Sequence, residues 1–390
     1  MRALHLTLTA FLATGLVAAT ATIASAQQTK APAPKEPSRV SVETAVKGIS
    51  NPWSFAFLPD GRMLVNEIKG TMRLVEKDGR VSSPIAGVPK VVTSGQGGLL
   101  DLALAPDFAT SGTIYFTFAE SRGGANSGTA VARAKLSTDG TGGRLDGVSV
   151  IFRQKPDYGT PMHFGSRIAI ASDGSLFVTL GERNTGRESG ERQQLAQNPS
   201  NHFGKVVRLN ADGTAHASTP KLPGWAPENW SIGHRNQQSA AITPATGRLW
   251  IVEHGARGGD EINIPEAGKN YGWPVISYGR DYSGAKIGTG AQKSGMEQPI
   301  YYWDPSIAPS GMAFYTGDLF PAWKGNLFVG ALAGSHLTRL VLSGDKVVGE
   351  EKLLTSERER IRDVRQGPDG AIYVATDSGR GRILKITPGK

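Results

Sequence analysis

The side chains that could do chemistry gather in a few polar stretches of an otherwise glycine-rich and apolar sequence. These stretches are 94–100, 163–167, 181–184, 233–237, 253–263, 270–274 and 360–363. His163 offers a base that works near neutral pH, and Glu182 lies where it could orient that base. The two residues indicate proton abstraction, provided that the fold brings them together.

Three arginines in these stretches suggest an anionic ligand. Arg235, Arg360 and Arg362 would place fixed positive charge near one point, and a guanidinium group suits carboxylates through forked hydrogen bonds. The glycine-rich segment beside Asp260 and Glu261 offers carbonyl and carboxylate oxygens, which suit calcium better than zinc. The sequence has neither a cysteine nor an H-E-x-x-H pattern to support zinc, and no G-x-G-x-x-G opens a helix to hold a nicotinamide cofactor.

Each of these features taken alone also fits a structural role. Gln96 could cap a turn, His163 could be a packed histidine, and Asp260 with Glu261 could form a solvated turn. Arg360 and Arg362 share one strand face by alternation, so they could belong to a surface ion-pair network. Their joint occurrence in the connections, outside the strands, favours a functional site.

The elements that would position these side chains are visible as a repeat. A glycine, one variable residue and an apolar β-prone triplet recur at Gly61, Gly112, Gly174, Gly247, Gly325 and Gly370, each after a strand-like run. Turns such as Asp60-Gly61 between apolar runs indicate hairpins. Six similar hairpins predict an all-β, six-bladed β-propeller with four-stranded antiparallel blades, each hairpin supplying the middle strands. A β-sandwich would not explain six similar units, and six blades are favoured over seven.

Three segments are expected along the 390 residues. Residues 1–26 are typical of a cleaved secretory signal, because Arg2 precedes an apolar run that ends at Ala24-Ser25-Ala26. Residues 27–39 contain prolines and charges and are expected to be a linker, and 40–390 form the propeller. No other segment is apolar enough to cross a bilayer. The mature protein is therefore expected to be periplasmic or secreted, with no membrane insertion after signal cleavage.

The composition narrows the classes of molecule that the protein could bind. The net charge is +9, but the basic residues are scattered, which argues against nucleic-acid binding and favours a local basic pocket for an anionic small molecule. Without cysteine, the fold has to be held by its core, by its closure or by a metal.

Several of these stretches, in this order, resemble the soluble aldose (glucose) sugar dehydrogenases that depend on pyrroloquinoline quinone (PQQ). The similar pieces are 95–100, His163 with Gly165 and Arg167, 233–236, 258–263, 270–274 and 360–363. The resemblance extends over nearly the whole mature chain and implies a propeller enzyme that oxidises an aldose at C1 to the lactone, with hydride transfer to PQQ. The electron acceptor is unknown, and a monomer or homodimer is expected.

The resemblance also implies roles for individual residues. His163 matches the general base that takes the proton of the anomeric hydroxyl, and Glu182 falls where the family has an acidic residue that orients this base. Arg235 matches the cation that polarises the quinone, with Asn236 beside it. The other residues expected to hold PQQ are Gln96, Tyr282, Arg360 and Arg362.

Calcium is implied by the same resemblance. One ion beside the cofactor would take backbone carbonyls near Gly255 and Ala256, and Glu261 with Tyr271 resemble a further calcium site. The chain departs from the family pattern at three places. Gln237 and Ala256 stand where proline is common, and Ala333 lies in a loop where some members place a lysine that contacts PQQ.

Two other functions remain open on the sequence alone. A calcium-dependent propeller lactonase or esterase would use the same acidic residues and histidine without a quinone. A non-catalytic propeller would bind carbohydrate or a partner. The set formed by Arg235, Arg360 and Arg362 favours the dehydrogenase, because a hydrolase has no evident need for it.

Overall fold

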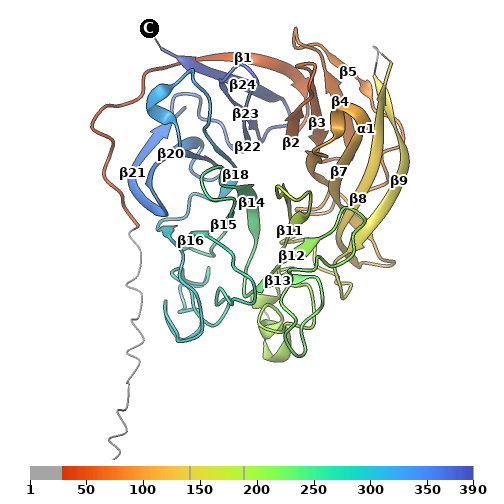
Figure 1. Ribbon diagram of the computed structural model, residues 1–390. Helices are drawn as coiled ribbons and strands as arrows, with labels where there is room; N and C mark the ends of the chain where they lie inside the picture. The colour runs from red at the N-terminus through yellow and green to blue at the C-terminus, as the bar shows by residue number, and fades with distance from the viewer. Residues whose placement is uncertain (1–28, 140–141, 188, 390) are drawn as a thin grey trace, which may run out of the picture.

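Six four-stranded antiparallel sheets surround a common centre in the computed structural model, which describes residues 29–139, 142–187 and 189–389 (Figure 1). The prediction of a six-bladed β-propeller is confirmed. The signal expected over 1–26 lies outside the described residues. None of the helices in the described part of the chain is long and apolar enough to cross a membrane.

The blades follow one another along the chain. Blade 1 contains β2 (Pro52–Phe57), β3 (Met63–Glu67), β4 (Thr71–Val75) and β5 (Val81–Pro84), and blade 2 contains β6 (Leu99–Leu104), β7 (Thr113–Ser121), β8 (Ser127–Thr138) and β9 (Gly143–Arg153). Blade 3 contains β10 (Gly165–Ile170), β11 (Leu176–Leu180), β12 (Lys205–Leu209) and β13 (Asn229–Ile232), and blade 4 contains β14 (Gln237–Ile242), β15 (Leu249–Glu253), β16 (Asp260–Asn263) and β17 (Tyr301–Trp303). Blade 5 contains β18 (Pro309–Phe314), β19 (Leu327–Ala331), β20 (His336–Ser343) and β21 (Lys346–Leu353), and blade 6 contains β22 (Ile361–Gln366), β23 (Ile372–Thr376), β24 (Gly381–Pro388) and β1 (Val40–Ile49). The connections hold the short helices α1 (Phe108–Ser111), η1 (Thr185–Arg187), η2 (Gly190–Gln194) and η3 (Pro321–Trp323).

The predicted hairpins exist, but they do not supply the middle strands of the blades. Each hairpin forms the first and second strands of its sheet, as β2 with β3 and β10 with β11 do. The first strands of neighbouring blades contact one another and ring the centre. A hairpin pattern reports which strands pair and leaves open how far they lie from the axis, so this part of the prediction was wrong.

The last blade is completed by the first strand of the chain. β1 pairs antiparallel with β24, with Val42 opposite Ile386 and Lys47 opposite Arg382. The pairing joins the first and the last of the described strands in one blade, which is visible at the top of Figure 1. Closing the ring in this way gives each of the six described sheets four strands.

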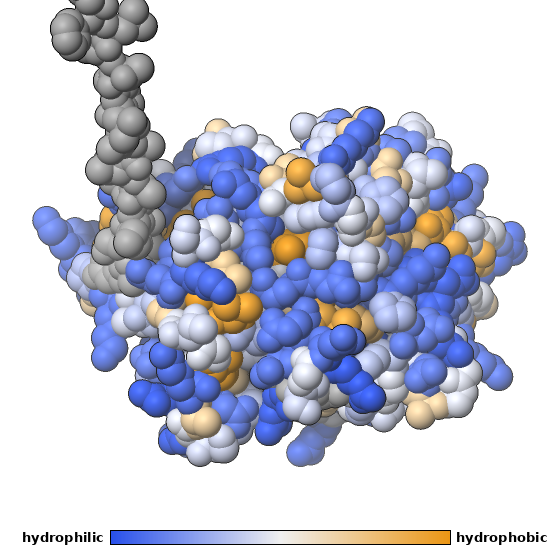
Figure 2. All heavy atoms as spheres, turned by 90° about the horizontal axis from the view of Figure 1, so that it is seen from below, coloured by the Kyte–Doolittle hydropathy of each residue, from blue (hydrophilic) through white to orange (hydrophobic). Residues whose placement is uncertain are grey.

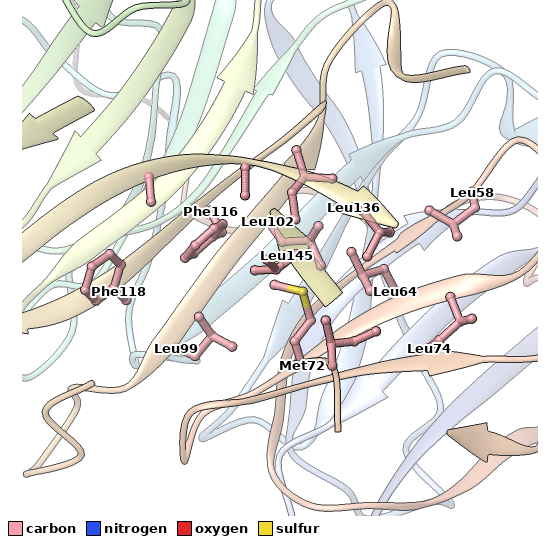
Figure 3. Close-up of a cluster of buried hydrophobic side chains, with 14 of the residues drawn as sticks. Leu58, Leu64, Met72, Leu74, Leu99, Leu102, Phe116, Phe118, Leu136 and Leu145 are labelled. Carbon is pink, nitrogen blue, oxygen red and sulfur yellow. The ribbon is translucent and has the colours of Figure 1, made fainter. Parts of the chain in front are cut away.

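The apolar core lies between the faces of adjacent blades. Second strands such as β3, β11 and β23 are buried at every position, because each sheet is covered on both faces. The cluster between blades 1 and 2 includes Leu64, Met72, Leu102 and Phe116 (Figure 3). On the side of the molecule shown in Figure 2, hydrophobic residues appear as separate spots among hydrophilic ones.

Charged side chains from the first strands fill the centre of the ring. Arg167 on β10 contacts Asp101 on β6 at 3.1 Å and Asp363 on β22 at 2.9 Å, and donates to the Gln238 carbonyl on β14 at 2.7 Å. Arg365 bonds both aspartates from the other side. This network lies in the first strands, at the axis of the propeller. It connects blade 3 with blade 6, which are not neighbours.

Candidate active site

The topology brings the predicted site residues to one face of the propeller. Gln96, His163, Arg235 and Arg360 precede the first strands of blades 2, 3, 4 and 6, and Glu182 follows the second strand of blade 3. Because paired antiparallel strands run in opposite directions, starts of first strands and ends of second strands lie at the same edge. We call this edge the site face.

Irregular pairing at this edge re-aims the side chains. In all six blades, the pairing of the first strand with the second changes register near the start of the first strand, as between Gly165 and Ile168 or Ile361 and Asp363. Bulges of this kind bend a strand and turn its side chains toward a site. The repeated hairpins therefore form the scaffold. The residues at the irregular starts of the first strands form the site.

His163 and Glu182 form a buried pair. Nδ1 of His163 lies 2.5 Å from Oε1 of Glu182, and the two residues are 4% and 1% exposed. Oε2 of Glu182 accepts bonds from the Thr185 hydroxyl at 2.9 Å and the Gly186 N–H at 2.7 Å. The backbone N–H of His163 donates to Oε1 of Gln96 at 2.8 Å. Both side chains are therefore fixed from several directions.

The local backbone explains why this arrangement needs a glycine. His163 has a φ of 50°, in the left-handed region, and Gly181 passes directly against its carbonyl. A Cβ on Gly181 would lie 2.1 Å from that carbonyl oxygen, so only glycine allows the end of β11 to approach the His163 loop.

The electrostatics keep His163 neutral at physiological pH. Burial, and next the charge of Arg235, lower the pKa of His163, while Glu182 acts in the opposite direction. Burial opposes ionisation of Glu182, but His163, Arg235 and the Gly186 N–H together hold its pKa below the usual value. An ionised Glu182 accepts the Nδ1–H of His163, which leaves Nε2 of the imidazole as the basic atom.

Arg235 is buried beside this pair. Its backbone N–H donates to Oε2 of Glu253 at 2.7 Å, its Nη1 donates to the His254 carbonyl at 3.2 Å, and its guanidinium lies 5.1 Å from the ring centre of Trp273. The Nε of Arg235 has no hydrogen-bond partner within the described residues. A buried donor without a partner fits a site built to receive a ligand oxygen.

Asn236 contacts the backbone of the loop that carries His163. Its Oδ1 accepts the N–H of Gly165 at 3.2 Å and is also 3.2 Å from Nε2 of Gln238. Because Gly165 lies two residues after His163, this contact links the Arg235 segment to the loop that carries the base. Asn236 therefore helps to hold the loop that carries His163.

A cavity of about 300 Å³ on the site face contains three of the residues expected to hold a cofactor. Gln96, Arg360 and Arg362 line it, together with Trp53, Phe164, Gly165, Gln238 and His254. His163 is not a lining residue itself, but the two residues after it are. The Nε of Arg362 has no hydrogen-bond partner in the described part of the chain, which again fits a missing acceptor.

One lining residue, Asp377, was not found by sequence reasoning. Its Oδ2 contacts Arg360 at 2.9 Å and Arg362 at 3.3 Å, so one carboxylate neutralises part of the charge of both arginines. Although burial opposes ionisation, the two guanidinium groups lower the pKa of Asp377. Asp377 directly follows the second strand of its blade, much as Glu182 follows β11, and that shared position could have revealed it.

His254 is the other residue that sequence reasoning did not assign. Its Nε2 donates to the Pro309 carbonyl at 2.7 Å, and its own carbonyl accepts Nη1 of Arg235. Burial is the main cause that lowers the pKa of His254 to about 3, and the charges of Arg235 and Arg362 add to it. It lies between the cofactor-sized cavity and a smaller one, and lines both.

The smaller cavity, about 20 Å³, is lined by three of the four residues expected near calcium, and Ala256 is not among them. Gly255, Glu261 and Tyr271 line it together with Glu253. Burial, then the charges of Glu253 and Asp260, raise the pKa of Glu261 to about 8. A buried carboxyl group whose ionisation is opposed in this way fits a place where a cation would be accepted. Among the described residues, no group of three or more His, Asp or Glu side chains converges as a ready metal cage.

Two tyrosines that were predicted to take part in the site make other contacts. The Tyr271 hydroxyl donates to the Ile264 carbonyl at 2.6 Å and accepts the Glu266 N–H at 3.0 Å, so it does not face Glu261. Tyr282 is 56% exposed, lies 5.2 Å from the Arg187 guanidinium and does not line the cofactor-sized cavity. The structure therefore does not bring Tyr282 to the arginines with which it was predicted to act.

A larger cavity, about 530 Å³, lies between blades 4 and 5 at the opposite edge of the strands. Its walls include Thr243, Phe314 and the β20–β21 turn. It contains none of the site residues predicted from the sequence, so size alone does not identify the site.

The chain is similar to several known proteins. A family model described as glucose/sorbosone dehydrogenase matches residues 49–385. Aldose sugar dehydrogenase YliI of Escherichia coli (strain K12) is 43% identical over 357 residues, which cover 90% of this chain and 94% of that protein. Quinoprotein glucose dehydrogenase B of Acinetobacter calcoaceticus is 25% identical over 417 residues, covering 87% of this chain and 86% of that protein.

Solved structures show the same architecture. The crystal structure of the soluble aldose sugar dehydrogenase from Escherichia coli in the apo-form has a TM-score of 0.85 and 44% sequence identity, covering 90% of this chain and 99% of that one. The PQQ-bound form of the aldose sugar dehydrogenase from Streptomyces coelicolor has a TM-score of 0.74 and 29% identity, again covering 90% and 99%.

Proposed function

Because this chain belongs to the glucose/sorbosone dehydrogenase family, we propose that it oxidises the anomeric C1 hydroxyl of an aldose to the lactone, with hydride transfer to PQQ. The observation that carries the proposal is the buried His163–Glu182 pair beside a cavity lined by Arg360 and Arg362. A hydrolase would use the pair but has no evident need for the arginines.

His163 supplies the base in this proposal. Glu182 holds Nδ1–H, so Nε2 takes the proton of the C1 hydroxyl. Removing that proton makes the C1 hydrogen a better hydride donor. The imidazolium that forms is stabilised by the buried carboxylate of Glu182, which is why the pair has to be held together before substrate arrives.

The chain's own residues fit an anionic planar cofactor. PQQ, when bound, supplies the quinone that accepts the hydride. Gln96, Arg360 and Arg362 would hold it in their shared cavity, with Arg235 and Asn236 beside the base. The unpartnered Nε atoms of Arg235 and Arg362 would gain acceptors. Ala333 adds no positive charge, so the arginines have to provide most of the attraction for carboxylates.

Calcium is part of the same proposal. The carbonyls near Gly255 and Ala256 would hold an ion beside the cofactor, and Glu261 would bind a cation in the smaller cavity. A dication there would stabilise the ionised form of Glu261. Since the Tyr271 hydroxyl is engaged elsewhere, any contribution of Tyr271 has to come from its carbonyl oxygen.

We also propose a cell compartment and an oligomeric state for the enzyme. Export directed by residues 1–26 would place a propeller of residues 40–390, preceded by the 27–39 linker, in the periplasm or outside the cell. The enzyme would work there as a monomer or homodimer.

Reconstitution tests the activity. Purified apoprotein supplied with PQQ and calcium should reduce an artificial dye when aldoses are added, and His163→Ala should still bind PQQ but lose turnover. No dye reduction across a broad sugar panel, together with no PQQ binding by calorimetry, would contradict the proposal. Hydrolysis of lactones or esters without PQQ would favour the hydrolase instead.

A further inference from the structure

Cations on the rim of the cofactor-sized cavity are exposed and lack acidic partners. Lys69 follows Ile68, which lines the cavity, Arg358 lies two residues before Arg360, and Arg380 lies three after Asp377. All three are exposed, and none has an ion pair with any residue that the structure describes. They belong to connections on the site face, in blades 1 and 6 and between blades 5 and 6. We call these three residues the rim patch.

The acids near the rim patch are already neutralised. Glu357 and Glu359 both pair with Arg382, at 3.3 and 3.0 Å. Asp377 pairs with Arg360 and Arg362. The edge of the cavity therefore has an excess of positive charge that the protein's own carboxylates do not cancel.

The opposite edge of the strands lies away from the cofactor-sized cavity. Its turns contain locally paired charges, such as Asp60 with Arg62, Asp78 with Arg80 and Asp173 with Arg208. Exposed cations without an ion pair to any described residue occur at this edge too, at Lys77, Lys221 and Lys346, but the rim patch adjoins the residues that line the cofactor-sized cavity.

We propose that the rim patch docks an acidic electron-carrier protein that reoxidises the enzyme, an inference that rests on the proposed function. Each sugar oxidised delivers two electrons and two protons, counting the proton taken by His163. Two carrier molecules in turn each accept one electron, and both protons go to solvent. A carrier has to approach the cavity mouth, and complementary charge both orients it and speeds its association.

A pair of haem proteins that differ only in charge tests the docking. The probes are basic cytochrome c and the same cytochrome c with its lysines succinylated, which makes it acidic. With PQQ, calcium and an aldose present, the second-order rate of reduction at low ionic strength should be at least about tenfold higher for the succinylated form. The difference should shrink as salt is added, because exposed charges are screened.

Charge reversal locates the surface. Lys69→Glu, Arg358→Glu and Arg380→Glu combined should remove the preference for the acidic cytochrome and leave dye reduction within about twofold. The matched control is Lys77→Glu, Lys221→Glu and Lys346→Glu, which makes the same charge change in exposed connections of the opposite edge and should keep the preference. Dye reduction by each variant shows that it is folded and loaded.

The outcomes separate the two proposals. If wild-type enzyme reduces no dye, the proposed function fails and this inference fails with it. If the dye is reduced but both cytochromes react equally, or if the control variant loses the preference as well, the docking surface is overturned while the sugar oxidation stands.

Discussion

The reactivity of His163 is decided by its immediate neighbours. Burial and Arg235 keep the imidazole neutral, and Glu182 makes it a stronger base than burial alone would allow. Because the pKa of His163 lies below its ordinary value of 6.5, the basic form is present throughout the neutral range. We expect kcat to be flat across neutral pH and to fall only below the ordinary histidine pKa, which a pH profile of dye reduction measures.

Glu182→Gln separates orientation from charge. The amide oxygen of glutamine can still accept Nδ1–H, so the ring should stay in place. Losing the carboxylate lowers the pKa of His163 further, because Glu182 raises it. We expect kcat to fall about 100-fold and the acid limb of the pH profile to move to lower pH. An unchanged limb would show that Glu182 does not act on the base.

Asp377 should tune the affinity for the cofactor. Its carboxylate contacts both Arg360 and Arg362, so an incoming anionic ligand meets a negative charge beside them. Asp377→Asn removes that charge, and we expect PQQ to bind about tenfold more tightly in calorimetry. Asp318→Asn makes the same charge change at an exposed remote site and should leave the affinity unchanged. Weaker binding in Asp377→Asn would mean that Asp377 mainly holds the arginines in place.

Single residues could be predicted where their chemical type stood out in a connection. Gln96, Arg360 and Arg362 were named from the sequence and share one cavity, and His163 contacts Glu182 across the hairpin. Asp377 was missed because only the reversal of the chain between β22 and β23 brings it to the arginines. Tyr282 lies elsewhere because its position depends on a long connection that has no repeat to define its path.

Between strands, the close approach of β11 to the His163 loop is the critical contact. Gly181→Ala would place a methyl group against the His163 carbonyl, and the backbone on one side would have to move. We expect PQQ binding to survive and kcat to fall by at least about tenfold, because the base shifts relative to substrate. Gly379→Ala is the control, since among the described residues an added Cβ would meet Asn51 Oδ1 alone, at 3.9 Å. Equal activities in the two variants would contradict this.

The hairpins were predictable because paired strands leave a local mark of turn glycines and apolar triplets. Their place as first and second strands was not, since distance from the axis depends on contacts among blades far apart in the sequence. The register shifts at the start of β10 and β22 also leave no local mark, although they aim the site residues.

Across the whole molecule, the central charge network should be a major source of stability. Arg167→Met would leave Asp101 and Asp363 buried, with Arg365 as the remaining cation of the network and one backbone N–H on each carboxylate. We expect a loss of about 3–5 kcal/mol in the free energy of unfolding, measured in denaturant. Arg144→Met breaks the exposed pair with Asp146 and should cost less than about 1 kcal/mol. Similar losses in both variants would contradict the importance of burial.

The pairing of β1 with β24 has a consequence for the order of folding. β1 cannot find its partner until β24 has been made, so five blades can form before the ring closes. Contacts between such distant segments form slowly. Until that moment β1 is an unpaired edge strand in search of a neighbour, and a second copy of the chain at high concentration offers it the same partner in trans.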